Sequence, residues 1–120
     1  QPPTERVGVG LQPAREESRL GVLTVIAGDK AGFSHRLEGA KTRVGRAEEN
    51  ELVLDDPRVS RFHAEIDRVA EGYILRDLGS TNGTLVGGRR VQERLLEDGD
   101  VLTMGETRMR FGLITDPRRR

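Results

Sequence analysis

Three short segments carry side chains that could do chemistry together. An arginine follows a glycine at Gly45–Arg46, a serine and an arginine stand at Ser60–Arg61, and hydroxyl and amide groups stand at Ser80–Asn82. One guanidinium group can donate two parallel hydrogen bonds to two oxygens of a phosphate, and hydroxyl and amide groups can add further hydrogen bonds. This set of groups predicts a surface that binds a tetrahedral oxyanion.

Glycines accompany two of these segments closely enough to shape a loop around a ligand. The stretch DLGSTNGTLVGG at 77–88 alone holds four glycines, whereas a tight turn between two strands needs only two special residues. Gly45, Gly79 and Gly83 allow positive φ angles and a close approach of the backbone to a bound group. These segments are therefore predicted to be binding loops.

The elements that must position these loops are short strands. From Leu20 onward, apolar runs follow one another at intervals of about 8–12 residues, bounded by glycine, proline, asparagine or aspartate, with almost no helical period. This pattern predicts an all-β sandwich or barrel whose end loops are free to bind. The predicted strands are Leu20–Ala27, Ser34–Leu37, Lys41–Val44, Leu52–Leu54, Ala64–Arg68, Gly72–Arg76, Thr84–Val86, Asp100–Met104 and Thr107–Ile114.

The chain length of 120 residues suits one domain with one core. Residues 1–19 contain three prolines and no usable period, so we expect a flexible N-terminal segment before a domain at 20–115. Residues 116–120, which end in three arginines, are expected to be a flexible C-terminal end.

Composition narrows the class of function. Lysine plus arginine equals aspartate plus glutamate at 20 each, which disfavours a protein that grips nucleic acid mainly through its phosphates. The longest apolar run, GVLTVIA at 21–27, is too short to cross a bilayer, and no secretion signal is visible. The chain has no cysteine, so nothing points to an oxidising compartment, and we expect a cytoplasmic protein that does not bind membranes.

The spacing of the motifs resembles that of the forkhead-associated (FHA) domain. Its pattern is matched by GR at 45–46, SRFH at 60–63 and STNG at 80–83, with supporting matches in NELVLDDPRVSRFHA, DLGSTNGT and EDGDVLTMG. The resemblance runs from about Leu20 to Ile114. It implies an eleven-stranded β-sandwich that binds phosphothreonine peptides at one end, recruits partners phosphorylated by Ser/Thr kinases, and has no catalysis or cofactor of its own.

The resemblance also implies roles for single residues. Arg46 and Ser60 would hold the phosphate oxygens, and Arg61 would offer a further contact to phosphate or peptide. Thr81 would add a hydroxyl contact and border a slot for the threonine methyl group. Asn82 would hydrogen-bond the peptide backbone beside the phosphoresidue.

Four further positions match the family pattern in other ways. Gly45, His63 and Gly83 would shape the loops without touching the ligand, with His63 buried and satisfied by loop backbone. Arg58 matches a position that reads the third residue after the phosphothreonine in some relatives, where an arginine would favour an acidic residue.

Two departures from the family pattern stand out. The turn after NGT reads Val86-Gly87-Gly88 where an asparagine commonly precedes the glycine, but either dipeptide tolerates a tight hairpin. Phe62 stands where a polar residue is common, and it either packs on the surface or widens the peptide contact.

Other classes of function remain open from the residues themselves. Ser60, His63 and Asp77 are the residue types of a hydrolase triad, but no strand-turn-helix pattern surrounds a nucleophile. Two histidines, His35 and His63, without cysteine make a poor zinc-ligand set, so we expect no metal. A phosphate-independent scaffold that uses a sheet face is the remaining alternative.

One threonine lies outside the predicted domain. Thr4, within PPTER, could be phosphorylated and fold back into the site of its own chain, because tethering raises its effective concentration. We treat this self-inhibition as a hypothesis.

Overall fold

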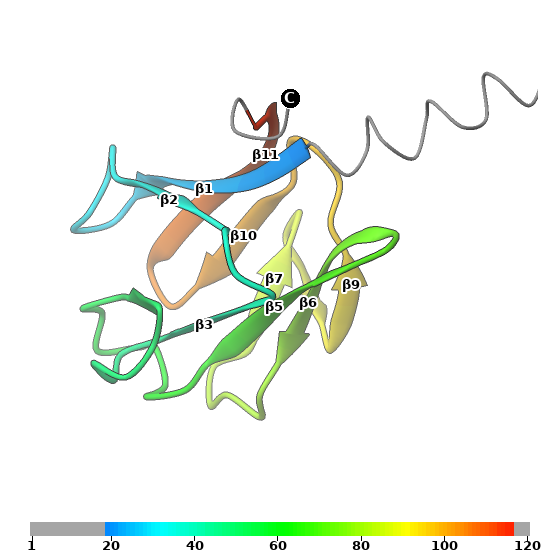
Figure 1. Cartoon of the computed structure of the whole chain (residues 1–120). Helices are drawn as coiled ribbons and strands as arrows, with labels where there is room; N and C mark the ends of the chain where they lie inside the picture. The colour runs from blue at the N-terminus through cyan, green and yellow to red at the C-terminus, as the bar shows by residue number, and fades with distance from the viewer. Residues whose placement is uncertain (1–18, 117–120) are drawn as a thin grey trace, which may run out of the picture.

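The computed structural model describes residues 19–116, which form eleven strands and no helix (Figure 1). This confirms the all-β, eleven-stranded fold. The strands are β1 (Arg19–Ala27), β2 (Ser34–Arg36), β3 (Lys41–Gly45), β4 (Leu52–Val53), β5 (Ala64–Val69), β6 (Gly72–Asp77), β7 (Thr84–Val86), β8 (Arg89–Val91), β9 (Glu93–Leu95), β10 (Val101–Met104) and β11 (Thr107–Thr115).

All nine strands predicted from apolar runs are present, each within one residue at either end. The sequence pattern missed β8 and β9, because the alternating apolar residues that revealed the other strands are absent from Arg89–Val91 and Glu93–Leu95. Gly87 and Gly88 have φ angles of 60° and 83° and form the two-residue turn between β7 and β8. The departure from the family pattern therefore keeps the hairpin.

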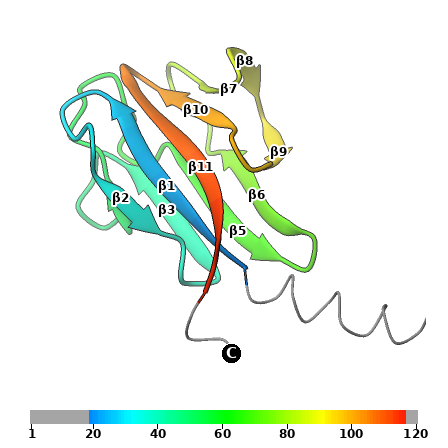
Figure 2. The same ribbon diagram turned by 90° about the horizontal axis from the view of Figure 1, so that it is seen from above.

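The strands form two sheets packed face to face (Figures 1 and 2). One sheet has six strands in the order β2-β1-β11-β10-β7-β8, and the other has five in the order β4-β3-β5-β6-β9. Neighbouring strands are antiparallel except β3 and β4, which are parallel. The segment between β6 and β7 passes from one sheet to the other, so it links both layers at the end where the binding loops were predicted.

The core lies between the sheets and follows the alternation of the strands. Leu102 and Met104 are fully buried, while Val101 and Thr103 face outward and are half-buried. Tyr73 from the five-stranded sheet meets Phe111 from the six-stranded sheet edge to face, with ring centroids 5.6 Å apart. The Tyr73 hydroxyl accepts a hydrogen bond from Gly21 N at 2.9 Å and so joins the two layers.

Several predictions concern residues that the structure does not describe. The N-terminal segment with Thr4 and the final residues 117–120 lie outside residues 19–116. The first strand begins at Arg19, one residue before the predicted start of the domain. Between Arg19 and Asp116 the chain forms no helix that could span a membrane.

Candidate functional site

The β3–β4 loop is fastened to the segment that leads into β5. Arg46 N donates to Ser60 O and Ala47 N donates to Arg61 O, both at 3.0 Å. The buried Asn50 side chain repeats this link, because its Nδ2 donates to Ala47 O and to Arg61 O, each at 2.8 Å. The backbone of Arg46 is thereby held beside that of Ser60.

Position 45 needs a glycine because the two loops approach each other closely there, and not because the backbone has a positive φ angle. A Cβ atom added there would stand 2.2 Å from Arg61 O and 2.9 Å from Asn50 Nδ2. The first of these atoms belongs to the backbone and cannot rotate away. Only glycine lets the two loops pack at this distance.

His63 joins the β4–β5 loop to the β6–β7 loop. Its side chain is fully buried, Ser60 N donates to Nδ1 at 3.1 Å, and Nε2 lies 2.9 Å from Gly83 O. A backbone N–H can only donate, so Nδ1 accepts, and Nε2 carries the proton that it donates to Gly83 O. The neutral ring satisfies one backbone group in each loop.

Two more hydrogen bonds cross the same junction. Thr81 N donates to the Ser60 hydroxyl at 3.1 Å, and Asn82 Nδ2 donates to Arg58 O at 2.7 Å. The three predicted segments therefore meet at one end of the sandwich. Because the Ser60 hydroxyl bonds Thr81, and both His63 nitrogens bond backbone groups, the hydrogen bonds of a Ser-His-Asp triad are not formed.

Asp77 organises the β6–β7 loop from within. Its Oδ2 accepts from Gly79 N and Ser80 N, and its Oδ1 accepts from the hydroxyls of Ser80 and Thr84. Ser80 in turn accepts from Gly83 N at 2.9 Å. Burial alone would raise the pKa of Asp77, but the bonds from Ser80 and Thr84 outweigh it, so the pKa lies below its ordinary value.

Asp56 fixes the β4–β5 loop to the six-stranded sheet. It accepts hydrogen bonds at 2.9 Å from Arg58 N, Glu106 N and the Thr107 hydroxyl. Burial opposes its ionisation, but these three bonds and the charge of Arg58 hold its pKa below the ordinary value. The loop that carries Ser60 is thus held by both layers of the sandwich.

The side chains predicted to meet a ligand are accessible at this end. Arg46, Arg61, Thr81 and Asn82 are exposed, and Ser60 is half-buried. Arg46 Nε donates to Val59 O at 2.9 Å, which orients the guanidinium group. No hydrogen bond within residues 19–116 uses its two terminal nitrogens, so both can donate to an oxyanion.

The structure shows the surroundings of Arg58 and Phe62, which the sequence did not reveal. Arg58 is exposed and its Nε lies 3.3 Å from a carboxylate oxygen of Glu106, so its charge already has a partner. Beside it lies an open hollow of about 120 Å³, lined by Arg58, Asn82, Gly83, Leu85, Thr103 and Gly105. Phe62 is 40% exposed at the same end, where an apolar group can contact a peptide.

Three residues that build the site are absent from the predicted binding and loop-shaping positions. Asn50 and Asp56 each join their own loop to another segment, and Asp77 bonds four donors within the β6–β7 segment. Asp77 does stand three residues before Ser80, the spacing of a side chain that bonds a turn, and this local signal could have identified it.

The comparisons with known proteins agree with this arrangement. The model of the FHA domain family matches residues 42–105. An oxoglutarate dehydrogenase inhibitor of Corynebacterium jeikeium is 36% identical over 102 residues, which are 85% of this chain and 69% of that protein. An ABC transporter ATP-binding/permease protein of Mycobacterium tuberculosis is 44% identical over 69 residues, which are 58% of this chain and only 8% of the transporter.

Solved structures show the same fold. The FHA domain of FhaA, solved in complex with the intracellular domain of another protein, superposes with a TM-score of 0.70 at 35% identity, covering 76% of this chain and 98% of that one. A structure from a study of phosphothreonine-dependent FHA domain interactions gives a TM-score of 0.72 at 34% identity, covering 78% of this chain and 95% of that one.

Proposed function

Because this chain belongs to the FHA domain family, we propose that it is a phosphothreonine-binding module that recruits partners phosphorylated by Ser/Thr kinases. The observation that carries the proposal is the hydrogen-bonded junction of three loops. This junction presents Arg46, Ser60 and Thr81 on one accessible surface. The relatives range from a transporter to an enzyme inhibitor, and the proposal concerns the class of partner, a phosphothreonine-containing protein.

The proposed binding mode gives each exposed group one task. The guanidinium of Arg46 and the hydroxyl of Ser60 bind the phosphate oxygens, and Arg61 adds a further cation. The Thr81 side chain borders the methyl group of the phosphothreonine. Asn82, already fixed by its bond to Arg58 O, uses its remaining amide capacity on the peptide backbone.

The peptide residues beside the phosphothreonine are recognised by side chains next to this junction. The hollow between Arg58, Asn82 and Gly105 is open to one flanking side chain of the peptide. Arg58 favours an acidic residue there, in competition with Glu106, which it already contacts. We therefore expect a modest preference for an acidic residue.

The energy of these contacts suits a reversible signalling interaction. Hydrogen bonds to a charged partner contribute about 1.5–3 kcal/mol each, so three or four contribute roughly 5–12 kcal/mol before ordering costs. A micromolar dissociation constant corresponds to about 8 kcal/mol. A short phosphopeptide can reach that range with a few flanking contacts.

The proposed role includes no catalysis, metal or cofactor. His63 bonds backbone groups with both nitrogens and has none left for proton transfer to a substrate. The cysteine-free chain is compatible with a reducing compartment, and the proposed place of action is the cytoplasm.

Calorimetry with three matched peptides tests the proposal. A phosphothreonine peptide should bind, its phosphoserine twin should bind more weakly, and the unphosphorylated parent should give no signal. Arg46→Ala should abolish binding in a folded domain, whereas Arg89→Ala, another exposed arginine, should not. Partner binding that survives Arg46→Ala would instead favour a phosphate-independent scaffold.

A further inference from the structure

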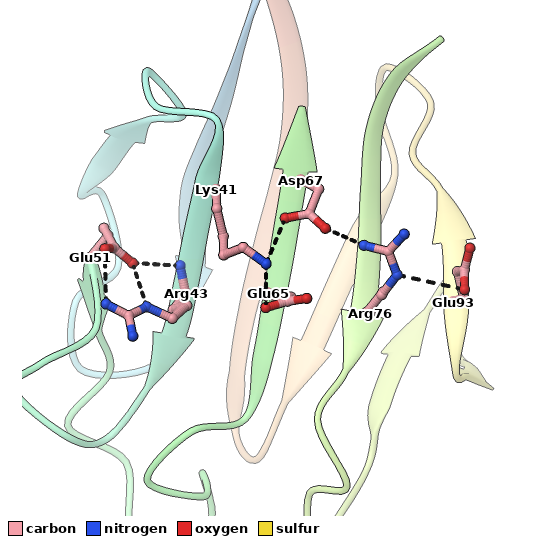
Figure 3. A network of polar contacts seen from close by, with 7 residues as sticks. All are labelled: Lys41, Arg43, Glu51, Glu65, Asp67, Arg76 and Glu93. Atoms are coloured by element: carbon pink, nitrogen blue, oxygen red, sulfur yellow. Dashed lines mark hydrogen bonds and ion pairs between the residues drawn. The ribbon is translucent and has the colours of Figure 1, made fainter. Parts of the chain in front are cut away.

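The two outer faces of the sandwich differ sharply in charge. On the five-stranded sheet and its rim, three cations and four carboxylates alternate (Figure 3). Lys41 bridges Glu65 and Asp67 at 3.1 and 3.3 Å, and Arg76 pairs with Asp67 and Glu93. Arg43 pairs with Glu51 and lowers the pKa of that carboxyl to about 2. This face satisfies its own charges.

The strand positions on the outer face of the six-stranded sheet carry only positive charge. Its exposed charged residues are Arg36 on β2, Arg90 on β8, and Arg108 and Arg110 on β11. The other outward positions of the described strands around them are occupied by serine, threonine, glycine and apolar residues. No ion pair or side-chain hydrogen bond between residues 19 and 116 involves these four arginines. An electrically neutral chain thus has one face whose strand arginines form no ion pair among the described residues, and the carboxylate of Asp98 lies beside Gly112 on β11 of this face.

Strand register places two of these arginines next to Leu85 and Thr103, which line the hollow beside the candidate site. Arg90 pairs with Leu85, Leu85 with Thr103, and Thr103 with Arg108, so the four residues form one row across β8, β7, β10 and β11. Arg110 stands two residues further along β11, about 7 Å away. We call Arg90, Arg108 and Arg110 the basic strip.

The basic strip is continuous with the loops of the candidate site. Arg90 packs on Gly83, because a Cβ atom added at Gly83 would lie 2.7 Å from Arg90 Nε. Gly83 follows Asn82, and both line the hollow whose floor includes Leu85 and Thr103. A chain that leaves the loops past Asn82 therefore passes directly onto the strip.

We propose that the basic strip binds an acidic segment of the same phosphorylated partner, beyond the residues next to the phosphothreonine. This inference rests on the proposed function and extends it to a second, purely electrostatic contact. The strip spans three interstrand spacings between Arg90 and Arg108, or about 14 Å, which an extended peptide covers in four to five residues.

A polypeptide fits this face better than other polyanions. The strip begins at the predicted peptide loops, and apolar and hydroxyl side chains lie between its charges. The zero net charge of the chain gives little of the general attraction that nucleic acid or an anionic membrane requires. Nucleic acid and lipid are therefore competing outcomes of the test.

The test measures the affinity of the full chain for phosphothreonine peptides with and without tails. One phosphothreonine peptide has no tail, and others carry eight residues of alternating Glu and Ser, or Gln and Ser, starting five residues before or after the phosphothreonine. For one of the two tail positions, the peptide with the Glu tail should bind about five- to twentyfold more tightly at low salt than the matching peptide with the Gln tail. A salt concentration of 0.5 M should remove this difference.

Variants locate the contact. Arg90→Gln, Arg108→Gln and Arg110→Gln together should remove the gain from the Glu tail and leave the affinity for the untailed peptide unchanged. The matched control combines Lys41→Gln, Arg43→Gln and Arg76→Gln, which removes the same charge from the opposite face and should keep the gain.

Four results would overturn the proposal. Equal affinities of Glu and Gln tails, or a gain that survives in the strip variant, would show that the strip does not bind acidic residues. Strip-dependent binding of a 20-base-pair DNA duplex or of anionic vesicles, tighter than that of the Glu tail, would assign the face to another class of ligand. Silence of all phosphopeptides would reject the proposed function itself and this inference with it.

Discussion

Replacing Gly45 with alanine tests the central junction of the site. The new Cβ would stand 2.2 Å from Arg61 O, more than 1 Å closer than the 3.4 Å at which ordinary contacts begin. The β3–β4 loop must then move away from Arg61, which stretches the bonds from Arg46 N and Ala47 N to their carbonyl partners.

The expected cost combines two effects. Overpacking of this kind costs about 1–3 kcal/mol, and two weakened hydrogen bonds add about 1 kcal/mol each. We expect Gly45→Ala to lower the free energy of unfolding by about 3–5 kcal/mol and the melting temperature by at least about 10 °C. Because the guanidinium of Arg46 moves with the loop, phosphopeptide affinity should fall more than about tenfold.

Urea unfolding followed by circular dichroism measures the stability, and calorimetry at a temperature where both proteins are folded measures the affinity. Gly39→Ala is the matched control, since a Cβ there meets no atom closer than 3.7 Å and its backbone needs no positive φ. It should change neither quantity. Wild-type stability and affinity in Gly45→Ala would refute the account of this junction.

Three further predictions concern the same end of the sandwich. Ser60→Ala should weaken phosphopeptide binding about 10- to 100-fold in calorimetry, because one hydroxyl contact to the phosphate is lost, with a stability change below about 1 kcal/mol; unchanged affinity would exclude that contact. Asp77→Asn should lower the free energy of unfolding in urea by about 2–4 kcal/mol, because Asp77 accepts from four donors and asparagine keeps only one of the two acceptor oxygens. Asp98→Asn should cost less, since Asp98 accepts only from Leu113 N, and equal losses would contradict the proposed role of Asp77. Lowering the pH from 7.5 to 5.5 should weaken binding about fourfold, since the phosphate takes up a proton near pH 6. The carboxyls of Asp56 and Asp77, whose pKa values are lowered, stabilise the fold above pH 3.8 and lose this contribution only below it, so pH-independent affinity in this range would count against phosphate binding.

Most of the fold could be predicted from the sequence because its strands are half-buried. Alternation such as that of Leu102 and Met104 against Val101 and Thr103 is written directly in the chain. The strands β8 and β9 could not be found this way, because they lie at sheet edges, where little burial is required of their side chains.

The site was predictable to a different depth. The motifs identified the exposed groups, such as Arg46 and Asn82, because their types match the chemistry of a phosphopeptide. The supports behind them were not predictable, since the bonds of Asn50 to Arg61 O and of Asp56 to Glu106 N join segments that only the folded chain brings together. The pairing of Arg58 with Glu106 arises in the same way.

Because the β6–β7 loop crosses from one sheet to the other, a ligand bound there would affect the stability of both sheets. Ser60 lies in the loop before β5 of the five-stranded sheet, and Asn82 lies just before β7 of the six-stranded sheet. A ligand that contacts both residues would therefore connect the two sheets, next to the hydrogen bond between His63 and Gly83 O. Separation of the layers would then require release of the ligand. Saturating phosphopeptide should therefore slow amide hydrogen exchange throughout both layers, including β1, which carries none of the residues proposed to contact the peptide.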